Sequence, residues 1–90
     1  MPTETLCLPE RLTLATVAAL HREHAPNAAL IAAFDVSAVR EWDSAGVALI
    51  QALRSEQHRR GAPAALVTGD AGRFAALCRA HRIADGGLAA

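Results

Sequence analysis

The residues best suited to chemistry lie in one short stretch, Trp42-Asp43-Ser44-Ala45-Gly46, directly before a run with helical spacing. A carboxylate stands here next to a hydroxyl. Ser44 can act as a nucleophile if a base reaches it, as a phosphate acceptor if a kinase reaches it, or as a helix N-cap. These roles correspond to an enzyme, a regulatory switch and a purely structural position, and the remaining sequence has to separate them.

Nucleophilic catalysis at Ser44 requires a base, and the candidates are His21, His24, His58 and His81. Each of them falls within an expected helix, and none lies in a loop that would converge on the serine. The stretch also lacks the Gly-x-Ser-x-Gly pattern of a nucleophile elbow. We therefore expect no enzyme activity and assign no catalytic residue.

Two further patterns resemble ligand sites but have simpler explanations. His21 and His24 stand three residues apart, a spacing compatible with metal ligation, yet no cysteine or carboxylate motif completes a set of ligands. The stretch 69–73 has glycines like those of a phosphate loop but no lysine, and Asp70 as a helix cap accounts for it. No metal and no cofactor are expected.

Composition limits the class of protein. The chain has 90 residues, 52% of them hydrophobic and only 3% aromatic, which suits one small domain with an aliphatic core. Nine arginines balance nine acidic residues, so the chain lacks the basic excess of a nucleic-acid binder and the cationic face of a membrane-surface helix. No apolar run approaches the roughly 20 residues that span a bilayer, and no direct membrane insertion is expected.

The N-terminus and the cysteines indicate a cellular compartment. The first twelve residues contain neither a positively charged segment nor a long apolar core, so no signal peptide is expected. Cys7 and Cys78 lie in separate apolar runs without metal-ligand spacing. The favoured interpretation is a pair of buried free thiols in a reducing, cytoplasmic location, with a disulfide as the alternative.

Hydrophobic periodicity predicts the elements that position these residues. In chain order we expect strands at 6–8, 28–34 and 64–69, and helices from Thr13 to Pro26, over 44–60 and after Asp70. The first helix should bury Leu14, Val17, Ala18 and His21, and the last should bury Phe74, Leu77, Cys78 and His81. The apolar run 28–34 predicts a strand that is covered on both faces or lies at the centre of a sheet.

Alternating strands and helices predict right-handed parallel crossovers and therefore an α/β fold. We expect a small sandwich with a mostly parallel or mixed sheet of three to four strands and helices mainly on one face. The chain should form a single domain over residues 1–90, with a core at about 6–83 and a frayed tail at 84–90.

The helix at 44–60 has one apolar and one uncharged face. The face toward the sheet consists of Gly46, Val47, Leu49, Ile50 and Leu53, and the opposite face of Ser44, Ala45, Ala48, Gln51, Ala52 and Ser55. A solvated helix face normally carries charged side chains, whereas small ones let another backbone approach closely. We predict a docking surface there; an alanine-rich composition is the alternative explanation.

Segment 35–46 resembles the signature of STAS domains. Asp35-Val36-Ser37 is similar to the family's D-L/V-S at a strand end, and Asp43 to Gly46 is similar to its D-S/T-S/T-G at a helix start. Leu8 to Leu12 resembles the L-x-G-x-L segment, and 59–69 resembles a later glycine-containing strand, so the resemblance covers about residues 6–83. The chain departs from the pattern at Glu10 and Ala45, and only residues 1–5 stand where the family has a further strand.

The resemblance implies a protein that binds partners and does not catalyse. The family's regulatory hydroxyl follows the aspartate, which makes Ser44 the candidate phosphorylation site. Combined with the uncharged helix face, the resemblance makes the expected partner-binding residues Asp43, Ser44, Ala45, Ala48, Gln51 and Ala52.

Two STAS subfamilies fit this description. One comprises the anti-sigma factor antagonists, in which a partner kinase phosphorylates the serine. The other is the MlaB-type subunit that sits on the cytoplasmic ATPase of the Mla phospholipid ABC transporter. Ala45 and the C-terminal stretch 74–83 favour the second. This resemblance implies a cytoplasmic location peripheral to the inner membrane and a role in outer-membrane lipid asymmetry.

Overall fold

The computed structural model describes residues 2–80, apart from four side chains of the last helix, those of Ala71, Leu77, Cys78 and Ala80. Predictions for His81, for the tail at 84–90 and for the side chains of Leu77 and Cys78 therefore fall outside the described residues.

The described chain alternates strands and helices. The elements are β1 (Glu4–Cys7), β2 (Arg11–Leu12), α1 (Leu14–His24), the 3₁₀ helix η1 (Ala25–Leu30), β3 (Ile31–Asp35), β4 (Glu41–Trp42), α2 (Ser44–Arg59), β5 (Leu66–Thr68) and α3 (Ala71–Ala80). The predicted α/β class is confirmed. The predicted bounds of α1 and α2 agree with the structure to within one or two residues, because local caps mark their ends.

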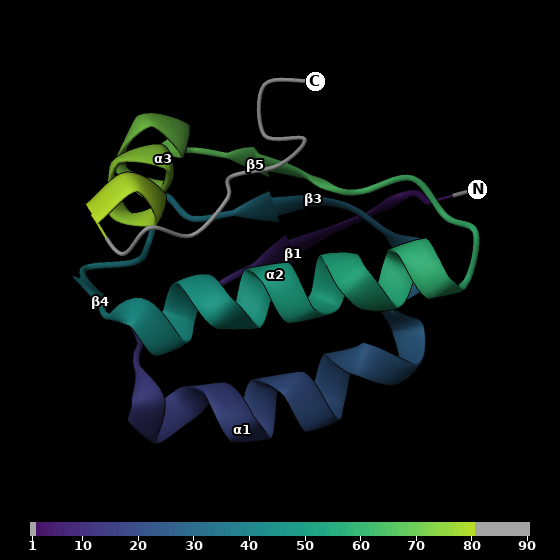
Figure 1. Ribbon diagram of the computed structural model, residues 1–90, viewed down its shortest axis with the longest axis horizontal. Coiled ribbons are helices and arrows are strands. Elements are labelled where there is room, and N and C mark those ends of the chain that lie inside the picture. The colour runs from purple at the N-terminus through teal and green to yellow at the C-terminus, as the bar shows by residue number, and fades with distance from the viewer. Residues whose placement is uncertain (1, 81–90) are drawn as a thin grey trace.

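All strand pairs of the described residues are parallel. β1, β3 and β5 form one sheet in that order, and β2 and β4 form a second, two-stranded one. The short pair was not predicted; it forms where the N–H groups of Arg40 and Glu41 both donate to the carbonyl of Glu10, at 2.8 and 3.0 Å. α1 and α2 run side by side in the same direction, with their N-termini at one end of the molecule (Figure 1).

One core joins the sheet to α2 and α3. Phe34 of β3, Ile50 and Leu53 of α2 and Phe74 of α3 are fully buried in the same cluster. Side chains on the opposite face of the sheet, by contrast, are accessible. Leu66 of β5 is 48% exposed. Thr5, Cys7 and Thr68, which share that face by the alternation of a strand, are exposed as well.

One prediction about burial holds in one of its two forms, and another is wrong. The run 28–34 was expected to be covered on both faces or to be central; β3 is central in its sheet, and its exposed neighbours on one face show that both-sided cover is not the form that holds. Cys7 was expected to be buried, and it is an exposed free cysteine, because its position on β1 points to the open face. An apolar run does not reveal how many layers cover it.

The strands β3 and β5 start later than predicted, because residues 28–30 belong to the 3₁₀ helix η1 and a buried glutamine binds backbone groups at both strand starts. The side-chain amide of Gln57 donates to the carbonyls of Ala28 and Ile31, each at 2.9 Å, and accepts from the N–H of Ala65 at 2.9 Å. Arg54, also buried, donates to the carbonyl of Ala65. Backbone groups satisfied by side chains have no need of a strand partner, so pairing starts later.

α1 buries a different face from the one predicted. Leu14 is 76% exposed, and Ala18 and His21 are exposed too. α1 lies against α2, and its half-buried residues are Thr16, Val17, Leu20 and His24. None of its residues is fully buried. α1 therefore lies at the edge of the core, and its face with Leu14, Ala18 and His21 is accessible.

Gly46 permits the close approach between α2 and β2. A Cβ atom at this position would lie 2.2 Å from the carbonyl oxygen of Leu12 and 3.0 Å from its Cγ. The sequence predicted that Gly46 faces inward, which is correct, and its contact is a backbone oxygen that cannot rotate away. The glycine therefore sets the distance between the start of α2 and β2.

We predict that Gly46→Ala destabilises the domain by about 1–3 kcal/mol, the usual cost of overpacking a tight site. In a small domain this lowers the melting temperature by several degrees, measured by circular dichroism. In an unobstructed helix the same change stabilises by up to about 1 kcal/mol. Gly72→Ala in α3 is the matched control, because no described atom beyond its own stretch of helix lies within 4 Å of its added Cβ. Equal effects of the two substitutions would contradict the steric role of Gly46.

Candidate docking site at the start of α2

The carboxylate of Asp43 caps two helices at once. Its Oδ1 accepts from the N–H groups of Ala45 and Gly46, at 2.9 and 3.2 Å, which caps α2. Its Oδ2 accepts from the N–H of Leu14, at 3.0 Å, which caps α1. The four first N–H groups of a helix have no partner within the helix, so one side chain satisfies unpaired donors at both starts. Asp43 is thus committed to holding the two helices together.

Ser44 is left exposed by this arrangement. The sequence offered Ser44 as a possible cap of the helix, and the structure gives the cap to Asp43. Ser44 becomes the first residue of α2, and its side chain is exposed. A hydroxyl in this position is accessible to a protein partner or to a kinase, and the helix does not depend on it.

The predicted partner-binding residues beyond Asp43 lie on one side of α2. Ser44 and Ala48 are exposed, and Ala45, Gln51 and Ala52 are half-buried. The predicted inward-facing residues Gly46, Val47, Leu49, Ile50 and Leu53 are all buried. The division of α2 into two faces is therefore confirmed.

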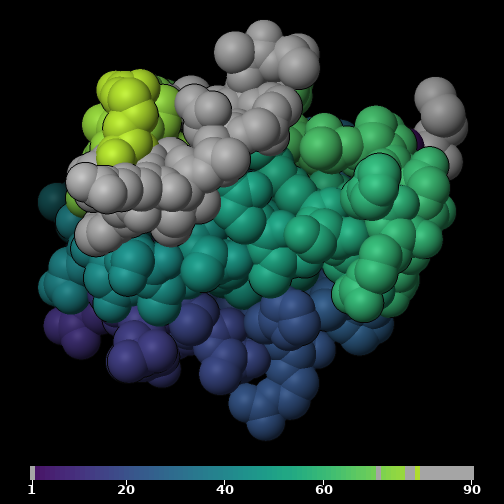
Figure 2. All heavy atoms as spheres, in the orientation of Figure 1, coloured from purple at the N-terminus to yellow at the C-terminus, as the bar shows by residue number. Residues whose placement is uncertain are grey.

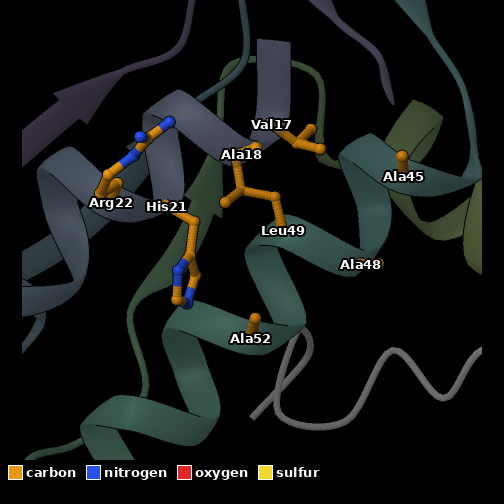
Figure 3. Close-up of a pocket in the computed structure, with 8 residues that line it drawn as sticks. All are labelled: Val17, Ala18, His21, Arg22, Ala45, Ala48, Leu49 and Ala52. Carbon is orange, nitrogen blue, oxygen red and sulfur yellow. The ribbon is translucent and has the colours of Figure 1, made fainter. Parts of the chain in front are cut away.

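A groove of about 500 Å³ runs between α2 and α1. It is lined by Ala45, Ala48, Leu49 and Ala52 of α2 and by Val17, Ala18, His21 and Arg22 of α1. Figure 3 shows the ring of His21 extending from α1 toward Ala52, and Leu49 extending from α2 toward α1. Figure 2 shows α1 flanking α2 along its length. The uncharged strip of α2 is thus one wall of a groove.

The α1 wall is the part of the site that sequence reasoning missed. Its residues were assigned to the core because Val17, Ala18 and His21 follow helical spacing with Leu14. The pattern does identify a continuous face of α1. It does not show whether this face meets the sheet or remains open.

The segment ahead of the site is held by polar contacts from both ends. The backbone N–H of Ser37 donates to Asp35 at 2.9 Å, and together with the Ser37 hydroxyl it holds the pKa of that carboxyl below its ordinary value. Arg73 of α3 donates to the carbonyls of Val39 and Arg40, each at 2.8 Å. These contacts fix the loop that leads into β4 and the start of α2.

Trp42, the residue directly before the cap, packs against α3. Its ring lies 5.9 Å from that of Phe74, and the guanidinium of Arg73 lies 6.0 Å from its centre. Aromatic and cation–π contacts of this kind each contribute about 0.5–1.5 kcal/mol. α3 therefore supports the start of α2 through Trp42.

The histidines weighed as bases or ligands have separate surroundings. His21 lines the groove, and His24 is 3.8 Å from Glu23. Among the described residues, no group of three His, Cys, Asp or Glu side chains is arranged to hold a metal ion. Nor does any described helix combine the length and apolar character that crossing a bilayer requires.

No protein-family model and no curated protein matches the sequence. The function is therefore inferred from the residues and geometry of the chain itself.

We predict that Asp43→Ala costs about 2 kcal/mol or more in the free energy of unfolding, because a single N-cap contributes about 0.5–2 kcal/mol and this carboxylate caps two helices. Ser44→Ala should change it by less than about 0.5 kcal/mol, as expected of an exposed side chain. Urea denaturation followed by circular dichroism measures both.

The control for this prediction is Asp70→Ala, which removes an ordinary single cap. Oδ1 of Asp70 accepts only from the N–H of Arg73 among the described cap bonds of α3, at 3.1 Å. If Asp43→Ala were no more destabilising than Asp70→Ala, the double capping would not matter to stability.

Proposed function

We propose that this chain is a non-catalytic STAS-type accessory subunit that docks on the cytoplasmic ATPase of an Mla-type phospholipid ABC transporter. In this role it is peripheral to the inner membrane and contributes to lipid asymmetry of the outer membrane. The observation that carries the proposal is the uncharged, open strip of α2 beside the exposed Ser44.

The strip has the physical properties of a docking surface. Its first three turns carry no charged side chain, so a partner can bury it without removing charges from water. Its alanines let a partner backbone approach closely. Because Asp43 supplies the cap, Ser44 can bind a partner or accept a phosphate without unwinding α2.

Ala45 separates the two candidate STAS roles. Where this family's antagonists have a second hydroxyl, this chain has an alanine that lines the groove. A methyl group adds apolar contact and offers no hydrogen bond, which suits a permanent interface better than a phosphorylation switch. The alternative, an anti-sigma factor antagonist phosphorylated at Ser44, is supported by the exposure of that hydroxyl.

Affinity purification from the native host, with mass spectrometry of the co-eluting proteins, tests the proposal directly. Recovery of an ABC ATPase together with a permease supports the transporter role. Recovery of an anti-sigma kinase without transporter subunits would replace it with the switch.

We predict that Ala48→Arg leaves the fold intact and prevents binding to the co-purifying ATPase. An exposed helix position accepts a long side chain within about 0.5 kcal/mol, whereas a bulky charge in a packed interface costs about 2 kcal/mol or more. Circular dichroism checks the fold, and a pull-down checks binding. Arg79→Glu, on the exposed side of α3, is the control that should bind like the parent. A folded Ala48→Arg variant with parental binding would show that docking occurs elsewhere.

We predict that Ser44→Glu weakens binding of the same partner while the melting temperature falls by less than about 8 °C, the shift expected from roughly 1 kcal/mol. The dipole of α2 favours a negative charge at its first residue, and the neighbouring Asp43 opposes it, so the net effect on stability is small. Ala76→Glu places the same charge on an exposed position of α3, away from the strip, and should bind like the parent. A larger loss of stability would make Ser44 a structural residue.

A further inference from the structure

We infer that the groove between α1 and α2 receives an amphipathic helix of the partner, and that this helix carries a carboxylate opposite Arg22. The inference rests on the proposed docking surface and extends it from one helix to two. It also specifies the chemistry of the segment that binds.

The walls of the groove favour a helix as occupant. Two helices that run side by side present parallel rows of side chains, and a third helix packs into the space between such rows. The α2 wall consists of alanines at positions 45, 48 and 52, which recur at the spacing of one helix face. Val17 and Ala18 of α1 form the facing apolar wall.

The polar lining lies on the α1 side and carries positive charge. Arg22 is charged at any physiological pH, and His21 offers ring nitrogens for hydrogen bonds. The lining contains no acidic residue. None of the ion pairs within the described residues involves Arg22. A bound helix with Asp or Glu at this level supplies the missing opposite charge, in the bidentate geometry that a guanidinium favours.

The same charge argues against a second copy of this chain as occupant. A symmetric dimer through the groove places two copies of the same lining against each other. That lining contains no acidic residue, so neither copy offers a carboxylate to pair with Arg22 of the other. A different protein with an acidic helix fits better.

Photo-crosslinking tests the inference with the full chain in its native host. The photoreactive residue p-benzoylphenylalanine is placed at Ala18, on the α1 wall, and in a control strain at Ala76, an exposed position of α3. Mass spectrometry then reads the sequence of the peptide joined to each position. The expected adduct from Ala18 is a segment of another protein with apolar residues at helical spacing and at least one Asp or Glu.

Binding of a synthetic peptide with the sequence of that adduct then tests the role of Arg22. We expect Arg22→Glu to weaken binding at least tenfold, and the control Arg79→Glu to leave it unchanged. Exchanging the peptide's acidic residue for arginine should restore binding to the Arg22→Glu variant. Equal binding of that variant and the parent would overturn the charge pairing.

The remaining outcomes also decide. No adduct from Ala18 above the level at Ala76, an adduct without an acidic residue, or an adduct with this chain itself would each overturn the inference. If Ala48→Arg blocks capture of an ATPase while Ala18 gives no adduct, docking is confined to α2 and only the inference fails. If Ala18 joins to an acidic helix of a protein that is not a transporter subunit, the groove stands and the proposed function fails.

Discussion

The carboxylate of Asp43 brings the starts of two helices together, and the arrangement of the domain depends on it. Each helix start carries a partial positive charge, so two of them side by side repel unless an anion lies between them. Asp43 provides this anion and accepts hydrogen bonds from both helices. Its own N–H donates to the carbonyl of Leu12, at 3.4 Å, which ties the same residue to β2. α1, β2, β4 and α2 therefore meet at one residue.

This junction explains why the candidate docking face of α2 remains accessible. Because both helices start at Asp43 and run in the same direction, they lie next to each other instead of stacking on the sheet as two layers. α1 has no fully buried residue, and it forms the wall of the groove that flanks the outer side of α2. The groove and the exposed Ser44 are thus consequences of how the two helices are joined.

Local signals predicted the helices well, and long-range contacts account for what the sequence did not predict. Asp43, Gly61 and Asp70 mark helix ends through contacts with residues a few positions away, so a short stretch of sequence is enough to predict these ends. The starts of β3 and β5 instead depend on Gln57, whose partners lie 8 to 29 residues distant. A glutamine inside a helix gives no sign that it will be buried against those backbone groups.

The same distinction applies to the site. The two faces of α2 follow from spacing, because a helix that packs on a sheet must bury its apolar side. Leu14 has equally regular spacing with its neighbours in α1, yet it is 76% exposed, because its burial depends on what lies across from it. One wall of the groove was therefore predictable and the other was not.

The double role of Asp43 also has a consequence for synthesis on the ribosome. α1 has only 11 residues and no fully buried side chain, and besides the local contact between Thr13 and Thr16 it depends on a long-range cap, Asp43, which lies 29 positions after Leu14. Isolated helices shorter than about 12–15 residues are marginal in water. At about 5–20 residues per second, the nascent α1 waits on the order of seconds for its cap. The first third of the chain therefore leaves the ribosome without stable structure, and folding begins once α2 has followed it out.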